Sequence, residues 1–268
     1  PMQRSMLSGN RVADAGKMAQ ALGVKHNKTE ITVFTDKMHD DILWSNYIKA
    51  YLDTAIRNDE FVVYLQPKFD IKTEKIKGAE ALIRWNYKKK EFLYPGKFIP
   101  LFEEDGLIAQ LDEYIWRCAA ETIADWKSRL GISVPVSVNL SRAEMYDPAL
   151  VETFEKITSE TGITAKDIYL EITESAYVRD AEQIVDRVKE LREHGFFIEM
   201  DDFGSGYSSL NMISELPIDA LKLDMMFIRN AFDKQNDTRM ISIVIDIADY
   251  LGVEPCTLHP LGGVVVGF

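Results

Sequence analysis

Two adjacent acids, Asp201 and Asp202, follow an apolar run that is typical of a buried strand, and a loop rich in glycine and serine comes next. Carboxylates this close repel each other, and burial adds to the cost, unless a cation lies between them. Carboxylate oxygens favour hard cations such as Mg²⁺ or Mn²⁺. The segment therefore predicts a metal site at the end of a strand, covered by a flexible loop.

Polar residues also recur at the ends of other predicted strands. They are Gln66, Lys68, Glu80, Arg84, Asn139, Glu171, Glu174, Lys222 and Asp224. Carboxylates and an amide that converge in this way can hold two cations a few ångströms apart, as in two-metal phosphoryl hydrolysis. We expect Lys222 to position an attacking water molecule. The planar guanidinium of Arg84 suits a phosphate group.

The elements that must position these residues alternate along the chain. Strands are predicted over residues 61–65, 76–85, 134–138, 168–172, 196–200 and 220–223, and helices over 41–57, 107–130, 148–161, 181–194 and 237–251. A turn at residues 72–75 makes an antiparallel pair of the first two strands. The alternation indicates an α/β protein, either a TIM-like (β/α) barrel or a doubly wound sheet. A barrel is favoured, because polar residues collect at strand ends and no GxGxxG or Walker loop follows a strand.

Composition limits the partners and the setting. The chain has 268 residues and a net charge of −12, which excludes a broad surface for a DNA or RNA polymer. A small anionic ligand remains compatible if divalent cations neutralise the site. No apolar run is long enough for a membrane span, and the first residues lack the apolar stretch of a signal peptide. Two cysteines, Cys118 and Cys256, form no disulfide framework, so we expect a cytoplasmic domain.

Six short motifs occur in order, each on a predicted strand. They are Tyr64–Pro67, Glu80–Trp85, Val138–Ser141, Glu171–Glu174, Asp201–Gly206 and Leu221–Asp224. With these motifs, the chain from about Ile42 to Leu251 resembles the EAL domain family, which hydrolyses the bacterial second messenger cyclic di-GMP to linear pGpG. The resemblance implies a TIM-like barrel with an antiparallel first strand and a two-metal site for Mg²⁺ or Mn²⁺.

The resemblance also implies roles for individual residues. One metal would be held by Glu80, Asn139, Glu171 and Asp201, and the second would be shared by Asp201 and Asp202. Catalytic roles fall to Glu80, Asp202, Glu174 and Lys222, with Lys222 on the catalytic water. Glu174 would brace the loop after Asp202, which serves metal binding and dimer contact. The dinucleotide would be bound by Gln66, Arg84 and Asp224.

Residues 1–40 resemble the end of a GGDEF domain running into a linker, with a strand at Glu30–Phe34, whereas residues 41–268 form the EAL-type domain. The signature loop of a GGDEF domain is absent, so no cyclase activity is expected of this chain. The resemblance implies a homodimer, upstream GGDEF or sensor domains, and possible attachment of the full-length protein to a membrane.

The family pattern breaks after Gly252. The family has a strand with the sequence Ala-Glu-Gly-Val-Glu there, followed by a helix and a final strand, whereas this chain continues as Val253–Phe268. The family spacing puts about Leu258 where a metal-site glutamate belongs. A barrel that lacks a strand has an open edge, which either a partner or the segment Gly262–Phe268 fills. We expect hydrolysis to be slow or absent.

Several alternatives remain open at this stage. The chain is either a metal-dependent phosphodiesterase or an inactive receptor that binds cyclic di-GMP and passes the signal on; a third interpretation is a dimerisation domain that uses residues 202–210. For single residues, Glu80 could form a core ion pair with Arg84, and Asn139 could cap the helix that follows it.

Overall fold

The computed structural model describes residues 35–70, 73–177, 181–204, 215–224, 226–227, 229, 239–258 and 264–266. The chain divides into two units, Pro1–Asp53 and Thr54–Phe268. Helix α2 (Asp36–Arg57) begins in the first unit and confirms the helix predicted over 41–57. The predicted strand at Glu30–Phe34 and the rest of residues 1–34 lie outside the described residues. No helix among the described residues is both long and apolar enough to cross a membrane.

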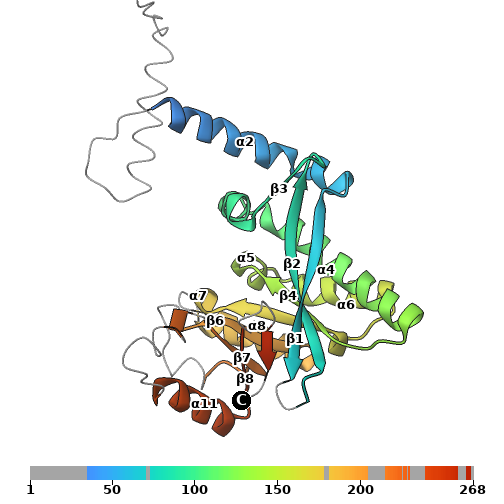
Figure 1. Ribbon diagram of the computed structural model, residues 1–268, viewed down its shortest axis with the longest axis vertical. Helices are drawn as coiled ribbons and strands as arrows, with labels where there is room; N and C mark the ends of the chain where they lie inside the picture. The colour runs from blue at the N-terminus through green and yellow to red at the C-terminus, as the bar shows by residue number, and fades with distance from the viewer. Residues whose placement is uncertain are drawn as a thin grey trace, which may run out of the picture. The chain divides into compact units, whose positions relative to one another are not determined.

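The second unit is built on a ring of paired strands (Figure 1). The strands are β1 (Phe61–Asp70), β2 (Ile76–Tyr87), β4 (Val136–Leu140), β5 (Ile168–Thr173), β6 (Phe197–Phe203), β7 (Ala220–Leu223), β8 (Glu254–Leu258) and β9 (Val264–Val266), with β3 (Glu91–Leu93) attached to β2. Neighbours from β2 and β4 to β8 are parallel, whereas β1 is antiparallel to β2. The prediction of a TIM-like barrel with an antiparallel first strand is confirmed.

The ring closes through the C-terminal segment. Strand β9 pairs parallel with Lys68–Asp70 of β1 and antiparallel with Cys256–Leu258 of β8. Because β1 also pairs with β2, the pairings return to their starting point. Of the two predicted ways to fill the gap, the structure therefore uses the chain's own C-terminal segment. Residues 259–263, which separate β8 from β9, lie outside the described residues.

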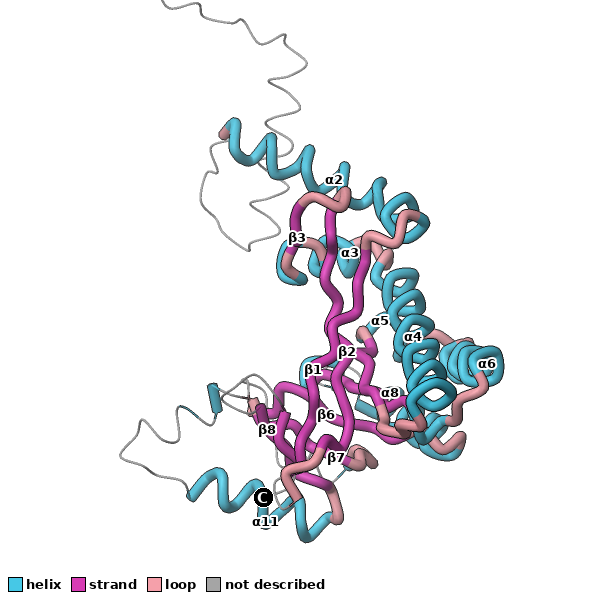
Figure 2. The backbone as a smooth tube through the Cα atoms, turned by 45° about the vertical axis from the view of Figure 1, so that its right-hand side comes forward, coloured by secondary structure: helices cyan, strands magenta, loops and turns pink. Residues whose placement is uncertain are grey.

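Helices cover the outside of the strands, and Figure 2 shows α4, α6 and α8 beside them. The helices of this unit are α3 (Ile99–Glu104), α4 (Ile108–Asp125), α5 (Arg142–Met145), α6 (Leu150–Thr161), α7 (Glu174–Tyr177), α8 (Ala181–Glu193) and α11 (Arg239–Leu251), and a π-helical turn, Trp126–Leu130, extends α4. Aromatic rings join the layers: the ring centroids of Trp116 and Phe154 lie 4.4 Å apart, and those of Phe154 and Phe196 5.5 Å apart. Burial of these apolar faces is the main favourable term for folding.

Alternation along β4, β5 and β6 separates an apolar outer layer from a polar interior. Successive side chains of a strand point to opposite faces, and the apolar set packs with the helices: Val136, Val138, Leu140, Leu170, Ile172, Ile198 and Met200. The opposite set includes Ser137, Asn139, Glu171, Glu199 and Asp201, with Tyr169 and Phe197 at the starts of β5 and β6. The strand register places Asn139 beside Glu171, and Glu171 beside Glu199. The strands therefore gather polar groups inside the ring.

A buried pair of acids lies between α4 and α5, away from this polar interior. Asp112 and Glu144 are both buried, and their carboxyl groups lie close enough for each to shift the pKa of the other, while Glu144 Oε1 has no hydrogen-bond partner among the described residues. Glu144 also closes a capping box, because its Oε2 accepts the backbone N–H of Ser141 at 2.7 Å. Burial raises the pKa of both carboxyl groups, and the charge of Asp112 raises the pKa of Glu144 further. The pair therefore favours a shared proton.

We predict that this pair makes stability fall as pH rises. The unfolded chain loses these protons at a pH near 4, whereas the folded chain retains one, so the unfolded state binds fewer protons above that pH. Asp112→Asn keeps a neutral donor and should flatten the decline of the free energy of unfolding between about pH 5 and pH 9. Denaturant titrations of both proteins at several pH values test this. Equal pH slopes for the two proteins would refute it.

Candidate active site

Lys222 lies among three carboxylates at one end of the barrel interior. Its Nζ is 2.9 Å from Glu80 Oε2, 3.1 Å from Glu171 Oε2 and 3.2 Å from Asp201 Oδ2. The four residues come from β7, β2, β5 and β6, so the barrel register brings together positions far apart in the sequence. One oxygen from each of the three carboxylates lies within 4.8 Å of the others. This spacing allows three oxygen ligands to converge on one cation.

The charges in this group depend on one another. Burial raises the pKa of Glu80, and the neighbouring Glu171 raises it further, while Lys222 lowers it. Burial also acts to raise the pKa of Glu171, but the ammonium groups of Lys222 and Lys68 outweigh it and hold that pKa well below its usual range. Burial acts to lower the pKa of Lys222, and the surrounding carboxylates raise it well above its usual value. Lys222 is therefore charged.

A second polar layer lies beneath the first and was missed by the sequence analysis. Lys68 contacts the carboxylates of Glu171 and Glu199, with its Nζ 2.9 Å from Glu171 Oε1. Ser137 Oγ donates to Glu199 Oε2 at 2.7 Å. The strand-end pattern in the sequence includes Lys68 but neither Glu199 nor Ser137. The two-residue alternation of a strand identifies Glu199, because it precedes Asp201 by two residues and faces the same side.

Asp202 lies outside the group of three carboxylates. Its φ angle is +58°, its side chain is exposed, and its backbone N–H donates to Asp201 Oδ1 at 2.9 Å. The positive φ follows the irregularity in the β6–β7 register between Met200 and Phe203. The structure therefore places Asp202 in an irregular step near the carboxyl end of β6, with its side chain directed away from the group of three carboxylates. Its predicted role in a second metal site stays a prediction.

The loop after Asp202 begins with a tight contact. Glu174 is buried, and its Oε2 accepts the backbone N–H of Gly204 at 3.2 Å. Gly204 has a φ of +97°, and a Cβ atom there would lie 2.6 Å from the ring of Phe227. Only glycine fits this position. The glutamate is thus placed to hold the start of the loop, while residues 205–214 of the predicted flexible loop lie outside the described residues.

The predicted ligand-binding residues occupy the rim and the β1–β2 hairpin. Gln66 lies directly opposite Glu80 in the antiparallel register. Arg84 lies on the same face of β2, with its guanidinium carbon 5.8 Å from the ring centroid of Tyr64. Asp224 Oδ1 accepts the backbone N–H groups of Met226 and Phe227, at 2.7 and 3.1 Å. Asp224 thus shapes the turn after β7, and its contact with substrate stays a prediction.

Two structural alternatives for single residues are wrong. The ion-pair partner that the structure gives Glu80 is Lys222, while the Arg84 guanidinium donates to the carbonyl oxygen of Ile83 at 2.8 Å. The helix after β4 is capped by Ser141, not Asn139. The Asn139 side chain is exposed at the carboxyl end of β4, next to Glu171 in the register.

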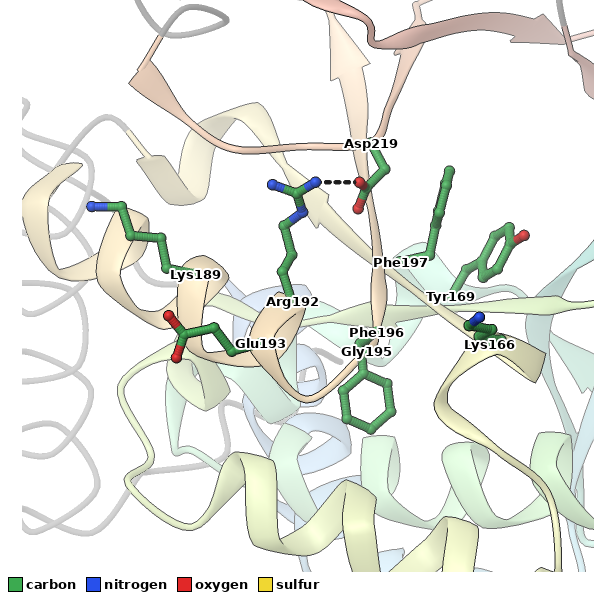
Figure 3. A pocket seen from close by; sticks show the side chains of 9 residues that line it. All are labelled: Lys166, Tyr169, Lys189, Arg192, Glu193, Gly195, Phe196, Phe197 and Asp219. Carbon is green, nitrogen blue, oxygen red and sulfur yellow. Dashed lines mark hydrogen bonds and ion pairs between the residues drawn. The ribbon is translucent and has the colours of Figure 1, made fainter.

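A cavity of about 590 Å³ opens at the other end of the strands, near the start of β5 and β6 (Figure 3). It is lined by Lys166, Tyr169, Lys189, Arg192, Glu193, Gly195, Phe196, Phe197 and Asp219. Arg192 Nη2 lies 2.7 Å from Asp219 Oδ1 and is therefore already paired. None of the residues around Lys222 lines this cavity, so we place the chemistry at the carboxylate group, not here.

Residues 49–258 match the family model for the EAL domain. Since this is most of the chain, the protein belongs to the EAL domain family. A cyclic di-GMP phosphodiesterase of Pseudomonas aeruginosa is 34% identical over 202 residues, covering 75% of this chain and 34% of that protein. Cyclic di-GMP phosphodiesterase PdeR of Escherichia coli is 28% identical over 225 residues, covering 84% of this chain and 34% of that protein.

A solved structure with a similar fold carries a ligand. The PaMucR phosphodiesterase in complex with c-di-GMP superposes with a TM-score of 0.74 at 27% identity, covering 83% of this chain and 95% of that one. This similarity supports the barrel described above. The chain spans about a third of the length of each of these two curated relatives.

We predict that Lys222→Met destabilises the fold. Removal of one partner of a buried ion pair leaves carboxylates without a counter-charge, which costs about 3–5 kcal/mol. The free energy of unfolding should therefore fall by that amount in denaturant titrations without divalent cations. Lys189→Met is the matched control, because Lys189 is exposed and its effect should stay below about 0.5 kcal/mol. Equal stability of the two variants would contradict the charge-balancing role of Lys222.

Proposed function

We propose that this chain is a metal-dependent phosphodiesterase that hydrolyses cyclic di-GMP to linear pGpG in bacterial second-messenger signalling. The observation that carries the proposal is the group Glu80, Glu171, Asp201 and Lys222 inside an EAL-family barrel. The named activity of two relatives and the ligand of one similar structure support the substrate.

The charges of the site suit a divalent cation. Lys68 and Lys222 face four carboxylates, those of Glu80, Glu171, Glu199 and Asp201. When all are ionised, the group has two more negative than positive charges. Oxygen ligands of this kind favour hard cations. We propose Mg²⁺ or Mn²⁺, held by Glu80, Glu171 and Asp201 with Asn139 beside them.

The cations and the side chains of the site would have different roles in the reaction. Bound cations would stabilise negative charge on the phosphoryl group and lower the pKa of the attacking water. Lys222 would orient that water, and its raised pKa supports a positive charge beside it. Gln66 and Arg84 would bind the dinucleotide along the hairpin, and Asp224 would contact it at the rim. Glu174 would hold the loop after Asp202 in place.

The proposed second cation site lacks one ligand that the family has. It would be shared by Asp201 and Asp202, but the family's second-site glutamate corresponds to about Leu258 here. We therefore propose slow hydrolysis. The alternative function is a receptor that binds cyclic di-GMP without cleaving it, which the altered segment Val253–Phe268 favours.

We also propose the neighbouring domains, the oligomeric state and the location of the chain from its membership of the EAL family. We propose that residues 1–40 are the tail of a GGDEF-like domain with its linker, and that residues 41–268 form the catalytic domain. Upstream GGDEF or sensor domains and a homodimer would follow from the family. A cytoplasmic location fits an intracellular messenger as substrate.

We predict that purified protein converts cyclic di-GMP to pGpG with Mg²⁺ or Mn²⁺, and that Glu80→Gln lowers kcat by about 100-fold or more. The loss is expected because the variant removes a charged ligand and a partner of Lys222. Glu152→Gln, at an exposed position on α6, is the matched control. Product analysis by chromatography and binding by calorimetry should be run on the same samples. Binding without conversion in the unaltered chain would favour the receptor instead.

We also predict that Leu258→Glu raises the rate. The change supplies a carboxylate where the family has its second-site ligand, and partners of this kind alter metal affinity or activity by about 10- to 100-fold. The turnover rate at fixed Mn²⁺ should therefore increase, whereas Leu258→Gln should give a smaller change. An unchanged rate in Leu258→Glu would argue that the missing glutamate does not limit hydrolysis.

A further inference from the structure

Lys68 is a buried lysine that the proposed chemistry does not use. It is 3% exposed, and all three donors of its ammonium group have partners. Its Nζ lies 2.9 Å from Glu171 Oε1 and 2.5 Å from Ser137 Oγ, and it also contacts the Glu199 carboxylate. A lysine this buried and this fully satisfied is held in one orientation.

The partners of Lys68 form a layer below the active site. Ser137 and Glu199 each precede a rim residue, Asn139 and Asp201, by two positions on the same strand. They therefore face the same interior but lie one step deeper. Glu171 belongs to both layers: its Oε1 binds Lys68, while its Oε2 lies 3.1 Å from the Nζ of Lys222.

This division of the two oxygens determines how Glu171 faces the site. A carboxylate on a free side chain can rotate and offer either oxygen, or both, to a cation. Here Oε1 is bound to Lys68, so Oε2 is the oxygen directed towards Lys222, whose Nζ also contacts Glu80 and Asp201. Glu199 is not a member of the group of three carboxylates; it contacts Lys68 and Ser137, and its carboxyl group also lies close enough to Glu171 to interact with it. Its position suits a counter-ion for Lys68.

We propose that Lys68, anchored by Glu199 and Ser137, is a positioning residue that fixes Glu171 with Oε2 towards the cation site and so sets the affinity for a divalent cation. This inference rests on the proposed cation site. Outer partners of ligand groups commonly change metal affinity by about 10- to 100-fold when they are removed.

Loss of the Lys68 charge and loss of its contact with Glu171 predict opposite changes in cation affinity, so an experiment can separate the two effects. Removal of the positive charge of Lys68 alone would make the site more negative and strengthen cation binding by Coulomb attraction. Loss of the hold on Glu171 would weaken binding. The double variant Lys68→Met with Glu199→Gln removes one positive and one negative charge, so the net charge of the layer is unchanged. Buried ion pairs often tolerate neutral replacements of similar size.

The experiment measures Mn²⁺ binding to the whole chain by calorimetry, with stability followed by denaturant titration. The double variant should bind Mn²⁺ about 10- to 100-fold more weakly. Turnover should return towards the original rate at high Mn²⁺ if only the affinity is altered. The matched control is Lys189→Met with Asp186→Asn, an exposed pair whose nitrogen and oxygen lie 3.5 Å apart, and its affinity should not change.

Each outcome decides the inference. A folded double variant with unchanged Mn²⁺ affinity would overturn the positioning role while leaving the proposed cation site intact. If the unaltered chain does not bind Mn²⁺, the cation site and this inference both fail. If the double variant does not fold, Ser137→Ala replaces it, because this change removes one anchor without changing any charge. It should weaken Mn²⁺ binding by about threefold, and unchanged affinity would refute the role.

Discussion

The structure depends on one buried carboxylate, Glu171, and on the two lysines that bind it. Glu171 has no exposed surface, and an ionised carboxylate in such a place costs several kcal/mol unless it is paired. Lys68 and Lys222 supply that pairing from opposite sides, one on each oxygen. The pairing that stabilises Glu171 inside the barrel is thus the same one that arranges the groups of the candidate site. Stability and chemistry are not separable at this position.

The strand register keeps Glu171 and its polar neighbours inside the barrel. A slip of one residue in a strand would move its polar side chains from the interior to the apolar layer under the helices. The pairing of Glu171 with Asn139 on one side and with Glu199 on the other keeps the polar set facing inward. The antiparallel β1 approaches from the opposite direction, and this direction carries Lys68 below Gln66. Gly78, which lies opposite Lys68, leaves room for the lysine side chain and for the carbonyl oxygen of Pro135, 3.1 Å from where a Cβ would lie.

The sequence predicted the fold well, because apolar periodicity and the six motifs both report on strands that end in polar residues. The positions of the motifs at strand ends also predicted that Glu80, Glu171, Asp201 and Lys222 lie close together. It did not predict the layer of Lys68, Ser137 and Glu199, because these contacts depend on how far β1 slides along its neighbours, which periodicity does not encode. The closure by Val264–Val266 was one of two alternatives, since three valines fit a strand without indicating its partner.

The short strand β9 has a consequence for how the C-terminus acts on the site. It pairs through only three residues on each side, and one of its partners is Lys68 itself. Segments held by few hydrogen bonds open locally at a lower free energy than the rest of a fold. Each opening would remove the pairing on one side of β1 at Lys68, while the other side stays paired with Gly78 of β2. The C-terminal segment would then affect how firmly Lys68 is held, through its pairing with β1 and without contributing a side chain to the candidate site.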